Sequence, residues 1–235
     1  MRRLGPLYGG AVALVHSTPW RWPLEVADEP RSPGWVVALA LPIGVIAYIA
    51  AALAHAVGMP AMLAAVVGMA ALALASAGIV EHGVVERIDR AEGGSPTVKS
   101  VLVLVFATLA RVAALAALPT DRWLGVLVAT AVVGRWSAVF LQALGDPIVD
   151  DHAPRSLVAA PAALWLTGAL GIGTVVLVVL ALGAKAGVAA LALTAAASFG
   201  LGLDAQRRDR GLSAPVVACA AAIGELCVLL IATMA

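Results

Sequence analysis

Long runs of apolar residues, separated by short polar connections, recur along this chain of 235 residues. A helix needs roughly 20 mostly apolar residues to cross the hydrocarbon core of a bilayer. The runs are continuous rather than alternating, which favours helices over the strands of a membrane barrel. We therefore predict an all-α, polytopic membrane helix bundle of about seven spans, forming a single domain over 1–235. The predicted spans are 35–57, 60–79, 100–118, 124–144, 157–182, 187–203 and 214–234.

Composition points to the same class of protein. Hydrophobic residues make up 62% of the chain and charged residues only 12%, about half of the charged share of a soluble domain. The net charge of +1 and the lack of a basic face exclude a nucleic-acid partner, and the apolar content excludes a disordered chain. Cys219 and Cys227 lie in the last apolar run, where we expect them to pack rather than to pair or bind metal.

The positions of Lys and Arg predict the orientation. One set of connections holds eleven of these residues, whereas the opposite set holds only Arg122 and Lys185. Because basic residues stay on the cytoplasmic side, we expect a cytoplasmic N-terminus and the richer set inside the cell. Trp20, Trp22 and Trp35 indicate an interfacial N-terminal segment rather than a cleaved signal peptide. The richer set comprises this segment (1–34), a motif region (80–99), 145–156 and 204–213.

The stretch after the second span carries the most informative polar pattern. Its sequence offers no break stronger than Gly83, and we expect the helix to continue straight on. His82, Glu86 and Asp89 then share one face, at spacings of four and three residues. Such a set can hold a divalent cation, since Mg²⁺ takes one or two carboxylates together with phosphate oxygens. The alternative is a charged helix end in which Glu86 pairs with Arg90.

Three charged residues lie inside the predicted spans. Arg111 and Arg135 fall near the middle of the third and fourth spans, and Glu225 near the middle of the last. A charge at this depth is costly, so each must face the interior of the bundle or a wet cavity. Glu225 is a natural partner for one of the two arginines. A structural ion pair and a role in binding substrate phosphate both remain open.

The order of these features resembles the cobalamin synthase family, the adenosylcobinamide-GDP ribazoletransferases. Members carry a Gly-Gly-x-His-Glu-Asp-Gly-Leu-Ala-Asp-x-x-Asp-Gly motif after the second span, and Ala77–Arg90 lies in register with it. Glu81, Gly83 and Asp89 match the motif, and Glu86 replaces an aspartate. Weaker matches extend over most of the chain, at Val15–Pro19, Leu41–Gly44, Arg111, Gly134–Trp136 and Ala222–Leu226.

This chain also departs from the family pattern. Val80 stands where the motif has its histidine, His82 where it has its first aspartate, and Arg90 where it has its final glycine. A segment that follows the motif in the family is missing after Glu92. A glycine-rich loop before the last helix is replaced by 209–215.

The resemblance implies transfer at the inner face of a bacterial inner membrane. There, α-ribazole would attack the activated phosphate of adenosylcobinamide-GDP, a nucleotide-activated corrinoid, and release GMP. The implied cofactor is Mg²⁺ or Mn²⁺, held by His82, Glu86 and Asp89. Glu81 would act as a catalytic base, and Arg135 together with Arg111 would neutralise the phosphate.

Two other functions compete with this one. The departures favour a catalytically inactive relative that serves as a partner-binding membrane subunit. The third hypothesis is a different phosphoalcohol transferase, which acts on a nucleotide-activated lipid headgroup. The oligomeric state stays open, a homo-oligomer included. A transporter fits less well, because no clear inverted repeat is present.

Overall fold

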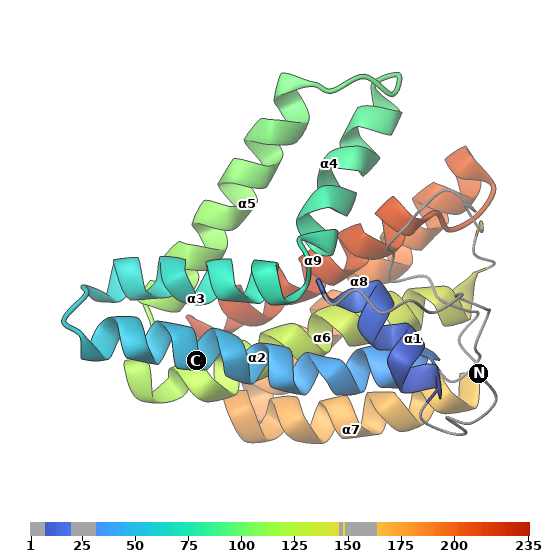
Figure 1. The fold of residues 1–235 in the computed structure, drawn as a ribbon. Coiled ribbons are helices and arrows are strands. Elements are labelled where there is room, and N and C mark those ends of the chain that lie inside the picture. Colours follow the sequence, from blue (N-terminus) through green and yellow to red (C-terminus); the bar gives the residue numbers. More distant parts are fainter. Residues whose placement is uncertain (1–7, 20–31, 146–147, 149–163) are drawn as a thin grey trace.

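A computed structural model describes residues 8–19, 32–145, 148 and 164–235. Within these ranges every regular element is a helix, as predicted. The longer helices form a bundle, and α4 and α5 stand side by side as a hairpin that rises from it (Figure 1). The elements are α1 (Tyr8–Ser17), α2 (Ser32–Ala56), α3 (Ala61–Ala75), α4 (Ile79–Ala91), α5 (Val98–Ala116), the 3-10 turn η2 (Thr120–Arg122), α6 (Trp123–Leu144), α7 (Leu164–Leu182), α8 (Ala184–Asp209) and α9 (Ala214–Ala232).

Six of these helices are long and apolar enough to cross a membrane, and the bent pair α3–α4 brings the number to as many as seven. The prediction of a polytopic membrane bundle is therefore confirmed. The predicted span 187–203 lies within α8, whose 26 residues make it the longest helix described. The predicted span 157–182 begins in residues outside the described ranges, and its described part is α7.

The second span ends earlier than its sequence suggests. The expectation that the helix continues straight past residue 79 is wrong, because α3 ends at Ala75 and α4 leaves at an angle of 80°. Ala77 and Gly78 both adopt left-handed backbone conformations, with φ of 56° and 64°. Ser76, at the end of α3, turns its hydroxyl back to the Leu72 carbonyl. This bend separates the charged residues of α4 from the apolar rod before them.

Helix α6 is the centre of the bundle. Buried residues make up 78% of its most apolar stretch, and it packs against α2, α7, α8 and α9. Small residues let these helices approach closely, as is usual inside membranes. A Cβ atom on Gly134 would lie 2.7 Å from the Glu225 side chain of α9, and one on Gly44 of α2 would lie 2.6 Å from the α6 backbone. These glycines therefore allow α6 to lie close enough to its neighbouring helices for charged side chains to contact one another.

Contacts between connections agree with the predicted grouping by side. Arg87 of α4 bonds to Asp209 at the end of α8, and the Ile148 backbone N–H donates to the Leu212 carbonyl. These contacts bring together three of the connections predicted to be cytoplasmic. At the other end of the bundle, the His55 ring lies 6.0 Å from the Trp123 ring, measured between centroids.

The N-terminal segment is partly helical. Helix α1 packs against α2 and buries Val12 and Ala13. A Cβ on Gly10 would meet the Trp35 ring at 3.2 Å, so one of the three predicted interfacial tryptophans contacts α1. Trp20 and Trp22 lie outside the described residues.

Candidate functional site

Five polar side chains from five helix segments meet in the interior of the protein. We call them the charged cluster. Four of them bear charge, and they stand up to 144 positions apart in the sequence. The bend after α3, the first turn of α4, and the middle parts of α5, α6 and α9 contribute one residue each. The members are Ser76, Glu81, Arg111, Arg135 and Glu225.

Arg135 is held from two sides. Its Nη1 donates to Glu225 Oε1 at 2.7 Å, and its Nη2 donates to the Ser76 hydroxyl at the bend. The side chains of Arg135 and Glu225 are only 1% and 2% exposed. The missing side chain of Gly134 leaves room for the Glu225 carboxylate, whose Cγ would otherwise contact a Cβ there. Gly134, next to Arg135 on α6, thus leaves the space that the Glu225 side chain of α9 occupies.

Arg111 joins the rest of the cluster to α4. Its Nη1 lies 3.2 Å from Glu81 Oε1 and 3.3 Å from Glu225 Oε2. Its Nη2 donates to the Ala222 carbonyl at 3.2 Å. Glu225 therefore pairs with both intramembrane arginines, which confirms the expected partnership and extends it to the second one. Glu81, at the start of α4, completes a set of two cations and two carboxylates.

Burial makes the neutrality of this cluster important. A lone charge in the interior costs several kcal/mol, whereas paired and hydrogen-bonded charges offset most of that cost. Three atoms of the cluster remain without a hydrogen-bond partner, namely Glu81 Oε2, Arg111 Nε and Arg135 Nε. Glu81 is also the most accessible of its charged members, with 23% of its side chain exposed. Glu81 is thus the charged member of the cluster that is most exposed to solvent.

The three predicted metal ligands do not come together. They lie on α4 as expected, and His82 Nε2 is 3.8 Å from Glu86 Oε2, but the His82 side chain is 79% exposed. Glu86 Oε1 accepts from Arg90 at 2.5 Å, which is the ion pair of the alternative interpretation. In the part of the chain that the structure describes, no group of three His, Cys, Asp or Glu side chains could hold a metal ion.

The Asp89 carboxylate accepts hydrogen bonds from the connection that follows α4. Its Oδ1 accepts from the backbone N–H and the hydroxyl of Thr97, both at 2.9 Å. Hydrogen bonds from Ser100 and Thr97 hold the pKa of the Asp89 carboxyl below its usual value, against an opposing effect of burial. Thr97 in turn caps α5 by accepting from the Ser100 N–H. Asp89 therefore closes the α4–α5 hairpin.

A second charged group went unnoticed in the sequence. Arg87 donates to Asp209 at 2.5 Å and to Asp204 at 3.3 Å, and Asp204 also accepts from Arg208 at 2.7 Å. This group ties α4 to the end of α8. The sequence contains one indication of this group: opposite charges lie in 80–99 and 204–213, two regions predicted to be on the cytoplasmic side. Opposite charge alone does not specify which residues pair. The acidic loop 149–152 lies outside the described residues.

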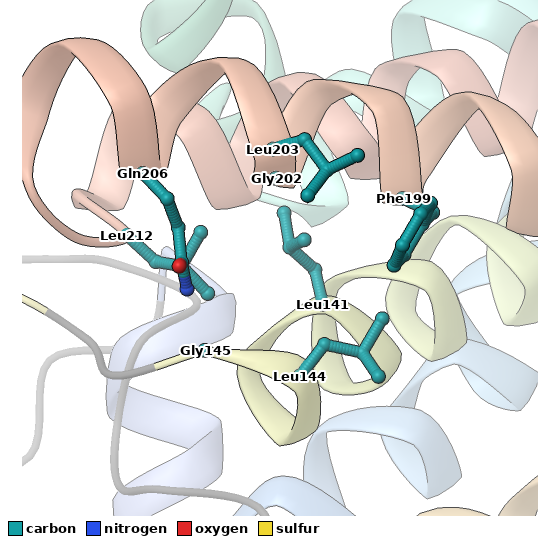
Figure 2. A pocket seen from close by; sticks show the side chains of 8 residues that line it. All are labelled: Leu141, Leu144, Gly145, Phe199, Gly202, Leu203, Gln206 and Leu212. Carbon is teal, nitrogen blue, oxygen red and sulfur yellow. The ribbon is translucent and has the colours of Figure 1, made fainter.

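A hollow of about 70 Å³ opens between the end of α6 and the end of α8. Figure 2 shows leucine and phenylalanine side chains around it and the amide of Gln206 at one side. It lies apart from the charged cluster, and none of the predicted site residues lines it. The lining residues are Leu141, Leu144, Gly145, Phe199, Gly202, Leu203, Gln206 and Leu212.

No family model, curated protein or solved structure matches this chain.

Proposed function

We propose that this chain is a membrane subunit organised like the cobalamin synthase family, but without the family's transfer chemistry, and that it acts by binding a partner. In this proposal the charged residues at the family's motif positions hold the helices together instead of holding a substrate. The protein belongs in a bacterial inner membrane, with α4 and the connection from α4 to α5 on the cytoplasmic side, as the distribution of Lys and Arg predicts.

The observation that carries this proposal is the pairing of Arg111 and Arg135. A phosphate ligand needs a cation with free donors directed at it. Arg135 spends both terminal nitrogens on Glu225 and Ser76, and Arg111 spends both on Glu81, Glu225 and a backbone carbonyl. The Nε donors of both arginines lack a partner but are buried. A pyrophosphate could reach them only by entering the cluster beside the Glu81 and Glu225 carboxylates, and this contact between like charges would cost several kcal/mol.

The predicted metal ligands fit Mg²⁺ poorly. Asp89 is turned to Thr97, and Glu86 is bound to Arg90. His82 offers an imidazole, which suits Zn²⁺ or Cu²⁺ better than a hard cation that prefers oxygen ligands. The proposed function therefore includes no metal ion bound by these three residues.

An exposed surface remains for the partner. His82, Glu86 and Arg90 follow one another at intervals of four residues along the outer side of α4. The same helix packs on α9, where a Cβ on Gly83 would lie 2.2 Å from the Ala218 Cβ. Helix α4 thus presents a fixed row of polar side chains, which suits recognition by a charged protein surface.

A second candidate is the transferase itself. Its support is the convergence of Glu81, Arg111, Arg135 and Glu225, since all four match positions in the family pattern and all four meet in one cluster. Glu81 Oε2 is buried and lacks a hydrogen-bond partner, so an unpaired carboxylate oxygen is present as a candidate base. Another phosphoalcohol transferase would use the same residues.

One assay separates the two candidates. The full chain is purified in mild detergent and mixed with adenosylcobinamide-GDP, α-ribazole and either Mg²⁺ or Mn²⁺, and the release of GMP is followed. An active cobalamin synthase in the same detergent is the positive control. We expect no release above background. Release that depends on the divalent ion and falls at least tenfold in Glu81→Gln would overturn the proposal and establish the transferase.

The partner-binding half of the proposal has its own test. A photo-crosslinking residue is placed at position 82 on α4 or, as a control, at the lipid-facing position 180 on α7, where Leu180 is 82% exposed. After irradiation of native membranes, we expect one discrete protein adduct from position 82 and none from position 180. Equal, diffuse labelling from both positions would contradict a specific partner on α4.

A further inference from the structure

The hollow between α6 and α8 has an apolar lining that reaches the outer surface of the bundle. Leu144, Phe199 and Leu203 line it, and these side chains are 43%, 50% and 44% exposed. Both helices are long and apolar enough to cross a membrane, so partly exposed apolar side chains on them face lipid. The hollow has a volume of about 70 Å³, well below that of pockets that enclose a whole ligand, so it has room for a short stretch of a flexible chain rather than for a rigid ring system.

One end of the hollow is polar. The Gln206 side chain lies there, and its Nε2 atom would be 2.5 Å from a Cβ on Gly145. Gln206 is followed directly by Arg207, and Arg210 stands two positions before the lining residue Leu212. The polar end of the hollow therefore lies at the same end of α8 as Arg207 and Arg210.

These two arginines are exposed and have no charged partner among the described residues, which distinguishes them from their neighbour. Arg208 is bound to Asp204 at 2.7 Å, whereas Arg207 and Arg210 form no ion pair there. Arg210 also ends α8 in a left-handed conformation, with φ of 60°. Two cations at the end of a membrane-spanning helix, on the side predicted to be cytoplasmic, attract anionic lipid headgroups.

We infer that this hollow holds a short segment of one acyl chain of an anionic phospholipid from the surrounding bilayer. The chain lies between Leu141, Phe199 and Leu203, and the phosphate group lies at the polar end, within reach of Gln206, Arg207 and Arg210. The lipid fastens the end of α8 to that of α6. This inference does not depend on the proposed function, since it concerns residues outside the charged cluster and outside the α4 surface.

The test uses the purified full chain after removal of bound lipid. Phosphatidylglycerol or phosphatidylcholine is added back, and native mass spectrometry measures the fraction of protein that carries lipid. We expect tighter binding of phosphatidylglycerol than of phosphatidylcholine. The double substitution Arg207→Gln, Arg210→Gln lowers the phosphatidylglycerol affinity by about tenfold. The matched control Arg122→Gln, Lys185→Gln removes two cations from the other end of the bundle and leaves the affinity unchanged.

A second pair of variants tests the apolar part. Leu203→Trp fills the hollow from α8, and Leu193→Trp places the same bulk on the same helix at a position that is 48% exposed and outside the hollow. We expect loss of phosphatidylglycerol binding in Leu203→Trp only, with both variants retaining the wild-type elution volume. The inference is overturned if both lipids bind equally, if Leu203→Trp binds like the wild type, or if the arginine variant matches its control.

Discussion

The carboxylate of Glu225 lies 2.7 Å from the guanidinium of Arg135, in a part of the bundle where neither side chain is more than 2% exposed. This contact joins α9 to α6, the two helices that bury the most residues. Arg111 contacts the second oxygen of the same carboxylate. One acid therefore pairs with two cations, and Glu81, which pairs with Arg111, supplies the second negative charge.

Removing the acid tests this relationship. Glu225→Gln leaves both arginines short of negative charge in the interior, and we expect it to lower the free energy of unfolding by about 3 kcal/mol. Thermal unfolding of the purified protein in mild detergent measures the loss. The control is Glu92→Gln, which breaks an exposed pair with Lys99 and costs about 0.5 kcal/mol or less. Equal losses in the two variants would contradict a structural role for Glu225.

The close approach of α6 and α9 makes a steric prediction. In Gly134→Ala the new Cβ lies 2.7 Å from Glu225 Cγ and 3.2 Å from the Ala221 carbonyl oxygen. We expect a loss of about 1–3 kcal/mol in unfolding free energy, because neither the backbone nor the paired acid can move away cheaply. Gly168→Ala on α7 is the matched control, since a Cβ there meets nothing within 4 Å. A loss of similar size in the control would refute this packing argument.

Asp89 gives a prediction about pH. Hydrogen bonds from Ser100 and Thr97 lower the pKa of its carboxyl in the folded protein, so its contribution to stability is complete above the unfolded value of about 3.9 and is lost as the pH falls through the lower folded value. We expect Asp89→Asn to lower the melting temperature at pH 7. The difference from the wild type should shrink below about pH 4.

The exposed Asp121 provides the comparison for this experiment. Asp121→Asn is expected to melt like the wild type from pH 7 down to pH 3. A constant difference between Asp89→Asn and the wild type over that range would show that the charge on Asp89 does not hold the α4–α5 hairpin.

The orientation in the membrane is open to a labelling experiment. In a chain that carries Cys219→Ala and Cys227→Ala, single substitutions Arg210→Cys and Lys185→Cys place thiols at opposite ends of α8. Because the side richer in Lys and Arg is expected inside the cell, a membrane-impermeant maleimide should label position 185 in intact cells. Position 210 should react only after the membrane is opened. The reverse pattern would place α4 and the connection from α4 to α5 outside the cell.

Most of the fold follows from the length of the apolar runs, because only a helix satisfies its own backbone in lipid. The exception is the bend at Ala77 and Gly78. Neither residue is a proline, and the left-handed conformation of Ala77 results from the packing of α4 on α9 and α5, which no local pattern records. For this reason the sequence extends the second span too far.

The site divides in the same way. The pairing of Glu225 with the intramembrane arginines was predictable, since few charged residues lie within the spans and each requires a partner. The addition of Glu81 was not predictable, because the sequence places Glu81 in a connection and does not predict the bend that turns it toward Arg111. Spacing placed His82, Glu86 and Asp89 on one helix, but it could not show that Thr97 would engage the Asp89 carboxylate.

The central claim is that the buried charges serve one another rather than a substrate. A double-mutant cycle between Arg135→Met and Glu225→Gln, followed by unfolding free energy in mild detergent, tests it most directly. We predict a coupling energy of about 2 kcal/mol or more, with the double variant more stable than the sum of the single losses implies. If the losses of unfolding free energy are additive, with a coupling energy below about 0.3 kcal/mol, the two residues do not stabilise each other. That result would contradict the claim and favour a role for both residues as substrate ligands.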